Sequence, residues 1–307
     1  MWVMVSLVLA AAIAPWLYQA GKSLADSAAV EDLPGVLEWL GAACGRSELS
    51  RFFNRALLLS ALVMLPVLVW RIQVVRAECV SKVISYVAVP WKSAVIQVGV
   101  GCFVAAGMLW GIGLLLEGLG VFMPKPGAPG FGKLLGKIVV PTVVVPPLEE
   151  WMIRGLLLGM WLKFSKPLTA CVGTSLFFAF IHFLKPPDGS VITDPASAWA
   201  GFELLGKVLL HFTNPRFFVT EFATLFLGGM ILAWARVRTG ALWFAIGLHA
   251  GWIAGFKGFN QLYQPVAHHP WGIGATFSGP FPMVTLGLTA VICHFALLRF
   301  DVKPAIG

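Results

Sequence analysis

The chain carries the stretch Pro146-Pro147-Leu148-Glu149-Glu150-Trp151-Met152-Ile153-Arg154, in which two carboxylates and a guanidinium lie near the middle of an apolar segment. Each charge at the centre of a bilayer costs about 2.5–3.5 kcal/mol on insertion scales, so charged groups inside a membrane span are rare and mark functional sites. Glu150 and Arg154 are four residues apart with the acid first, the favourable order for a helical ion pair. Glu149 is turned by about 100° on the helix. We therefore predict that Glu150 and Arg154 neutralise each other and that Glu149 is the acid–base group, with a purely structural ion cluster as the alternative.

The composition places this stretch in a membrane protein. Of the 307 residues, 58% are hydrophobic and 12% are charged, and the mean hydropathy is +0.84. An average soluble domain has about 25% charged residues, so a soluble globular protein is excluded, and so is a disordered chain, which needs many charges and few apolar residues. The formal charge of +8 is scattered between apolar segments and forms no basic run, which argues against a nucleic-acid partner.

A transmembrane helix needs about 20 mainly apolar residues, and by that measure the sequence predicts an all-α integral membrane protein with about eight spans. The short loops after the even-numbered spans are dense in Lys and Arg, which predicts that both termini are cytoplasmic. Between the fifth and sixth spans, apolar residues recur at helical spacing beside Glu203, Lys207 and His211, which predicts an amphipathic helix in the membrane interface. The predicted spans are 1–20, 52–70, 93–116, 138–161, 168–184, 217–235, 241–256 and 283–299.

Two histidines lie inside predicted spans. His182 is near the end of the fifth span, and His249 is in the seventh, which also has Gly247, Gly251 and Gly255 at four-residue steps. Such small-residue stripes let two membrane helices approach closely. On a helical wheel His249 points about 160° away from Gly251, so we expect it to face a central cavity. Two histidines, an acid pair and an arginine are the parts of a site that activates water.

The motifs of several known classes of membrane protease are absent from this sequence. No His is followed by Glu, so the zinc motif His-Glu-x-x-His is absent. The nearest approach to Gly-x-Ser-x-Gly has Phe177 at its last position, and no Asp lies in a predicted span to form an aspartyl dyad. Zinc held by Glu149, His182 and His249 is a chemical alternative. We expect no metal and no cofactor, because a zinc ion binding all three side chains would leave no separate base or oxyanion donor.

The order of these residues resembles the CPBP family, the intramembrane glutamic endopeptidases that include CAAX proteases and bacteriocin-processing enzymes and are related to Rce1-type proteases. The resemblance rests on Glu149-Glu150-x-x-x-Arg154, on Phe178-x-x-x-His182 and on His249 in a later span. It covers roughly residues 138–260. The resemblance implies an all-helical membrane enzyme that hydrolyses a peptide bond without a covalent intermediate. It implies that Glu149 and His182 activate the water and that His249 stabilises the oxyanion.

The resemblance gives supporting roles to Glu150, Arg154 and Phe178. One position departs from the family pattern. Family members often have Asn four residues after the last His, and Ile253 stands there in this chain. Isoleucine cannot donate a hydrogen bond to an oxyanion. The neighbouring candidates for that role are Trp252 and Asn260.

We therefore expect three segments: N-terminal membrane helices in 1–137, a catalytic core in 138–260, and a C-terminal loop and helix in 261–307. The expected function is an endopeptidase that cleaves a membrane-associated protein or peptide, embedded in a bacterial or archaeal cytoplasmic membrane. Ile253 motivates one alternative, a catalytically silent scaffold or assembly factor. A transporter that uses the Glu, His and Arg cluster as a proton relay is the other alternative.

Overall fold

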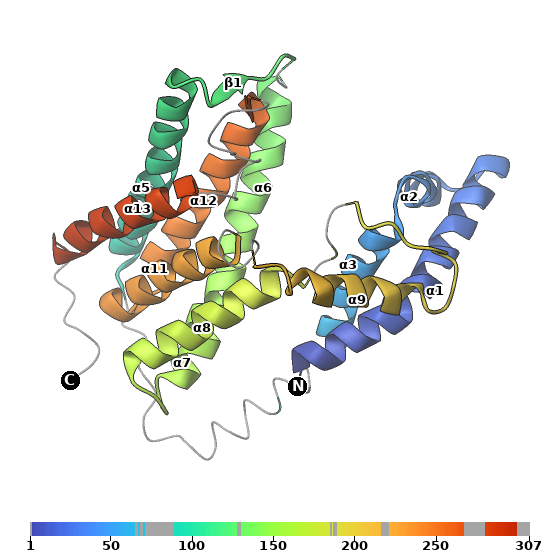
Figure 1. Ribbon diagram of the computed structural model, residues 1–307, viewed down its shortest axis with the longest axis horizontal. Helices are drawn as coiled ribbons and strands as arrows, with labels where there is room; N and C mark the ends of the chain where they lie inside the picture. Colours follow the sequence, from blue (N-terminus) through green and yellow to red (C-terminus); the bar gives the residue numbers. More distant parts are fainter. Residues whose placement is uncertain are drawn as a thin grey trace. The chain divides into compact units, whose positions relative to one another are not determined.

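The computed structural model describes residues 2–64, 67, 70, 89–127, 130–184, 186, 189–215, 221–266 and 280–299. These residues are almost all helical, as expected for an all-α protein, and they form two compact units (Figure 1). One unit consists of Met1–Ser81 and Ile181–Phe217, and the other consists of Lys82–Phe180 and Phe218–Gly307. The two units are defined by which residues pack together, whereas the three segments expected from the sequence were defined by the predicted site. Those three segments therefore remain a prediction.

The first unit is built around its N-terminal helix. Helix α1 (Trp2–Val30) packs against α2 (Gly35–Gly45), α3 (Leu49–Val63) and α9 (Ala200–His211). The sequence did not predict α2, which is a short helix between two predicted spans. The close contact between α1 and α9 depends on Gly201, since a Cβ there would overlap the carbonyl oxygen of Ala11.

Helix α9 confirms that the segment between the fifth and sixth predicted spans is helical. The helix buries Leu204 and Val208. Trp199, Phe202 and Leu209 are exposed, so these apolar side chains are available to the membrane interface in which the helix is predicted to lie.

The second unit holds the remaining elements. Its core is formed by buried residues of α5, α11, α12 and α13, among them Ala105, Leu232, Phe244 and Leu286. A short antiparallel ladder pairs β1 with β2, with Phe122 opposite Pro265. The elements are α5 (Trp91–Gly118), β1 (Phe122–Pro124), α6 (Phe131–Glu150), the π-helix η2 (Trp151–Leu157), α7 (Leu158–Trp161), α8 (Pro167–His182, whose last two residues belong to the first unit), α11 (Ala223–Thr239), α12 (Trp243–Leu262), β2 (Tyr263–Pro265) and α13 (Pro280–Arg299).

Helices α5 and α12 pack along their length, and the glycine stripe lies at their contact (Figure 1). A Cβ on Gly247 would overlap the carbonyl oxygen of Val98, and one on Gly251 would overlap that of Cys102. Close approach along this stripe is therefore confirmed. The contact also fixes the rotation of α12 about its own axis and turns the opposite face, which carries His249, away from α5.

The decisive stretch lies where α6 changes its hydrogen-bonding pattern. Three prolines are accommodated inside α6, and directly after it the chain forms one stretch of π-helix, Trp151–Leu157. Pi-helical turns are rare and occur frequently at functional sites. Along the outer face of α6, Val139, Val143 and Leu148 are exposed. An exposed apolar strip of this kind is typical of a lipid-facing helix.

Each of the eight predicted spans contains a helix, but eight membrane crossings are not established. Among the described residues, the helical segments Val3–Val30 and Trp91–Gly118 are long and apolar enough to cross a bilayer. Pro167–His182 and Pro282–Phe295 are apolar but shorter. Parts of the predicted spans 52–70 and 217–235, and the cations of the loop at 71–88, lie outside the described residues.

The contact between α5 and α12 yields a prediction for stability. We expect Gly251→Ala to destabilise the protein by about 1–3 kcal/mol, because the added methyl group meets backbone that cannot move aside. Gly99→Ala on α5 is the control, since nothing lies within 4 Å of a Cβ at that position. Thermal unfolding in detergent measures both variants, and equal melting temperatures would contradict this account of the packing.

Candidate active site

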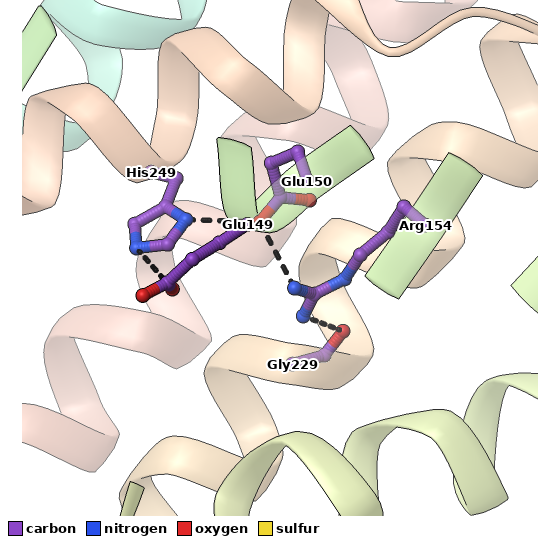
Figure 2. Close-up of polar contacts among 5 residues, drawn as sticks. All are labelled: Glu149, Glu150, Arg154, Gly229 and His249. Carbon is purple, nitrogen blue, oxygen red and sulfur yellow. Dashed lines mark hydrogen bonds and ion pairs between the residues drawn. The ribbon is translucent and has the colours of Figure 1, made fainter. Parts of the chain in front are cut away.

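The candidate site lies in the second unit, at the end of α6. Glu149 and Glu150 are the last two residues of α6, and Arg154 follows in the π-helix. Figure 2 shows both carboxylates and Arg154 together with His249 of α12 and the backbone of Gly229 of α11. Residues distant in sequence are therefore brought to one point by the packing of α6, α11 and α12.

The predicted ion pair between Glu150 and Arg154 is confirmed. Arg154 Nη1 lies 2.9 Å from Glu150 Oε1, and both side chains are fully buried. Further hydrogen bonds reduce the free-energy cost of burying an ion pair. Arg154 Nη2 donates to the carbonyl oxygen of Gly229 at 3.3 Å, and the ring of Phe178 lies with its centroid 4.2 Å from Arg154 Cζ. The guanidinium is thus held by a carboxylate, a backbone carbonyl and an aromatic ring.

His249 binds the same carboxylate oxygen, a contact that the sequence did not predict. Its Nδ1 lies 2.9 Å from Glu150 Oε1, the oxygen that also accepts from Arg154. An ionised carboxylate has acceptors only, so we assign the proton to Nδ1 and His249 donates to Glu150. The imidazole and the Phe178 ring also meet edge to face, with centroids 6.1 Å apart and planes at 86°. The orientation of the imidazole is therefore fixed from two directions.

The other imidazole nitrogen faces Glu149. His249 Nε2 and Glu149 Oε2 are 3.8 Å apart, and the Glu149 side chain is 32% exposed, whereas that of Glu150 is 0% exposed. This separation is too long for a direct hydrogen bond, and a water molecule or a substrate oxygen can interact with both groups at such a spacing. The two neighbouring carboxylates thus differ in environment, and the more accessible one is Glu149.

Several polar atoms around the ion pair are buried and have no hydrogen bond within the described part of the chain: Glu150 Oε2, Arg154 Nε and Ser175 Oγ. Glu149 Oε2, which faces His249 Nε2, is buried as well, so the exposed fraction of Glu149 belongs to other atoms of its side chain. Within the described part of the chain, no group of three or more His, Cys, Asp or Glu side chains lies close enough to hold a metal ion. The polar groups that meet here suit proton transfer and hydrogen bonding.

Three further predicted residues, His182, Trp252 and Asn260, are not among the contacts described above. His182 is the last residue of α8 and falls in the other compact unit, so its role rests on the sequence motif. Trp252 packs against the core between α11 and α13, and its Nε1 is buried with no hydrogen-bond partner among the residues described. Asn260 lies eleven residues beyond His249 on the same helix, roughly 16 Å along its axis. The structure does not bring Asn260 to the site. Its backbone carbonyl oxygen accepts a hydrogen bond from Lys125 Nζ.

Comparison with known proteins gives one family match. Residues 131–254 match a family model described as "Type II CAAX prenyl endopeptidase Rce1-like". The matched segment runs from the start of α6 into α12, and it contains the acid pair, Arg154, Phe178, His182 and His249. It covers less than half of the chain. No curated protein and no solved structure gives a significant match.

The shared oxygen of Glu150 yields a prediction that separates the two carboxylates. Glu150→Gln replaces an acceptor that serves both Arg154 and His249, and breaking a buried ion pair from one side costs about 3–5 kcal/mol. Glu149→Gln keeps the shape of a partly exposed side chain and is expected to leave stability nearly unchanged. Thermal unfolding in detergent tests this difference. Equal melting temperatures of the two variants would contradict the idea that the buried Glu150 contributes more to stability than the partly exposed Glu149.

Proposed function

Residues 131–254 of this chain form an Rce1-like domain, consistent with a CPBP/Rce1-type family of membrane-embedded proteases, and from this premise we propose that the protein is an intramembrane endopeptidase that uses Glu149 to activate water. The substrate is a membrane-associated protein or peptide, and both termini of the enzyme are in the cytoplasm. The observation that carries the proposal is that Glu149 Oε2 and His249 Nε2 face each other at 3.8 Å. The buried ion pair of Glu150 and Arg154 lies beside them, and Glu150 holds His249 in place.

Water attack begins at Glu149. A carboxylate that is partly exposed can meet a water molecule and take its proton as the hydroxide oxygen bonds to the substrate carbonyl carbon. Glu149 then returns the proton to the leaving nitrogen as the carbon–nitrogen bond breaks, so the carboxylate is regenerated. The family motif assigns His182 to orient the water. No covalent bond between enzyme and substrate is needed at any step.

His249 stabilises the negative charge that develops on the carbonyl oxygen. Its Nδ1–H donates to Glu150, so the imidazolium form has one remaining donor, Nε2–H, directed to the side where Glu149 lies. A fixed donor of this kind is worth far more in a water-poor site than in water. Glu150 acts through His249 as a positioning residue, because its Oε1 accepts from Nδ1 and thereby fixes the ring. Arg154 in turn holds Glu150.

Ile253 supports a second candidate function. It is on α12 one turn after His249, where the family often has an Asn that would supply a further oxyanion donor. With one donor fewer, the chain would be a catalytically silent scaffold that keeps the ion-pair architecture. The proposed enzyme and this scaffold differ in one outcome, the appearance of new peptide termini.

The first functional prediction concerns cleavage. Membranes that contain the intact protein are expected to show a new substrate terminus in comparative proteomics, and Glu149→Gln is expected to lower its rate of formation at least about 10²-fold, because it removes the proton acceptor. Glu117→Gln on α5 is the matched control, since this partly exposed carboxylate lies outside the candidate site. Identical termini with and without the protein would favour the scaffold.

The second functional prediction concerns metal dependence. The purified protein is expected to keep its activity after exhaustive chelation, because Glu149, His182 and His249 act as base, water-orienting group and oxyanion donor and none is occupied as a ligand. His182→Ala and His249→Ala should each lower turnover, and added zinc should rescue neither. Activity that is lost with chelator and returns with zinc would instead make the protein a metalloprotease.

A further inference from the structure

Gly229 lies on α11 directly beside the buried guanidinium. Its carbonyl oxygen accepts a hydrogen bond from Arg154 Nη2 at 3.3 Å, which Figure 2 shows as the contact on the side of Arg154 away from His249. No role was predicted for Gly229 from the sequence. Because the carbonyl belongs to the helix backbone, its position depends on where α11 itself lies.

The position of α11 relative to α8 is set at Gly229. A Cβ on Gly229 would lie 3.1 Å from Ser175 Cβ, 3.2 Å from Ser175 Cα and 3.3 Å from Ser175 Oγ. These distances are shorter than ordinary carbon contacts of about 3.5–4.0 Å, so a methyl group on Gly229 requires Ser175 or the backbone of α11 to move by a few tenths of an ångström. The preceding residue differs, since a Cβ on Gly228 would meet its nearest atoms at 3.9 Å, on Trp252, and 4.0 Å, on Leu286.

Helix α8 carries the second group that holds the guanidinium. Phe178 follows Ser175 by three residues, which places both on the same side of α8, and its ring centroid is 4.2 Å from Arg154 Cζ. The close approach at Gly229 therefore determines two contacts of Arg154 together, the backbone carbonyl from α11 and the aromatic ring from α8. Arg154 is bonded to Glu150, and Glu150 to His249 Nδ1.

We propose that Gly229 is a positioning residue for the reaction: by letting α11 and α8 approach closely and by supplying its carbonyl, it fixes Arg154 and, through Arg154 and Glu150, the imidazole of His249. This inference rests on the proposed function for its kinetic test. Gly229 lies outside the acid pair and outside both histidine motifs. In this proposal it helps to hold His249, whose Nε2 faces Glu149.

The kinetic test compares Gly229→Ala with Gly228→Ala, which adds the same methyl group to the next residue of the same helix. Gly229→Ala is expected to lower kcat on the order of tenfold, since displacements of about 1 Å at a reacting centre can cost 10²-fold. KM should change little because neither Gly229 nor Arg154 contacts substrate in the proposed mechanism. Gly228→Ala should keep the wild-type kcat. Ser175→Gly in the Gly229→Ala background removes two of the three close atoms and should restore part of kcat.

A double-mutant cycle with Arg154→Lys separates positioning from general loss of packing. A lysine keeps the charge but cannot bind Glu150 and the Gly229 carbonyl together in the arginine geometry. If Gly229 acts through Arg154, the effects of Gly229→Ala and Arg154→Lys on kcat will be non-additive. The same cycle measured by thermal unfolding in detergent requires no cleavage and should show non-additive shifts in melting temperature.

Two results would overturn the inference: a kcat for Gly229→Ala equal to that of Gly228→Ala, or strictly additive cycles. Both leave the proposed function intact if the wild type cleaves and Glu149→Gln does not. Conversely, full cleavage by Glu149→Gln rejects the proposed function, while the unfolding cycle still decides whether Gly229 holds Arg154. Should Gly229→Ala alone fail to fold, folding of the Ser175→Gly double variant supports the close contact at Gly229, and failure of that double variant as well overturns it.

Discussion

The buried ion pair between Glu150 and Arg154 is the constraint on which the arrangement of the second unit depends. Removing both charges from water is costly, and the cost is offset only where hydrogen bonds meet the remaining donors and acceptors. Those partners come from other helices: His249 from α12, the Gly229 carbonyl from α11 and the Phe178 ring from α8. Each of these helices must therefore lie where its group reaches the ion pair, so the pair constrains how α8, α11 and α12 pack.

The pair also explains how two adjacent carboxylates come to differ. One residue of helix turns a side chain by about 100°, and this rotation puts Glu150 inside and leaves Glu149 partly exposed. Glu150 is already engaged in two hydrogen bonds, since its Oε1 accepts from both Arg154 and His249. Of the two side chains, that of Glu149 is the one with exposed surface. The division of roles that we propose uses this difference, which helix geometry produces.

The sequence predicted those features of the site that lie on one helix. The Glu150–Arg154 pair and the glycine stripe of α12 both follow from four-residue spacing, and both were confirmed. The contacts of His249 with Glu150 and of Arg154 with Gly229 were missed, because they join helices whose relative position a single helical pattern does not contain. The π-helix after α6 was missed for the same reason, since packing and not local preference decides it. The glycine pair Gly228-Gly229 in an apolar segment was the one visible signal of close packing on α11.

The direction of His249 is set from the far side of its helix. Gly247 and Gly251 let α12 pack closely against the backbone of α5, and this contact restricts the rotation of α12 about its own axis. His249 stands on the opposite face, so the same rotation delivers Nδ1 to Glu150 and Nε2 toward Glu149. Helix α5 (Trp91–Gly118) precedes the segment 131–254 that matches the Rce1-like family. The matched segment carries the polar groups of the site, and a helix outside it holds one of them in place, which gives this N-terminal region a physical role in the chemistry that we propose.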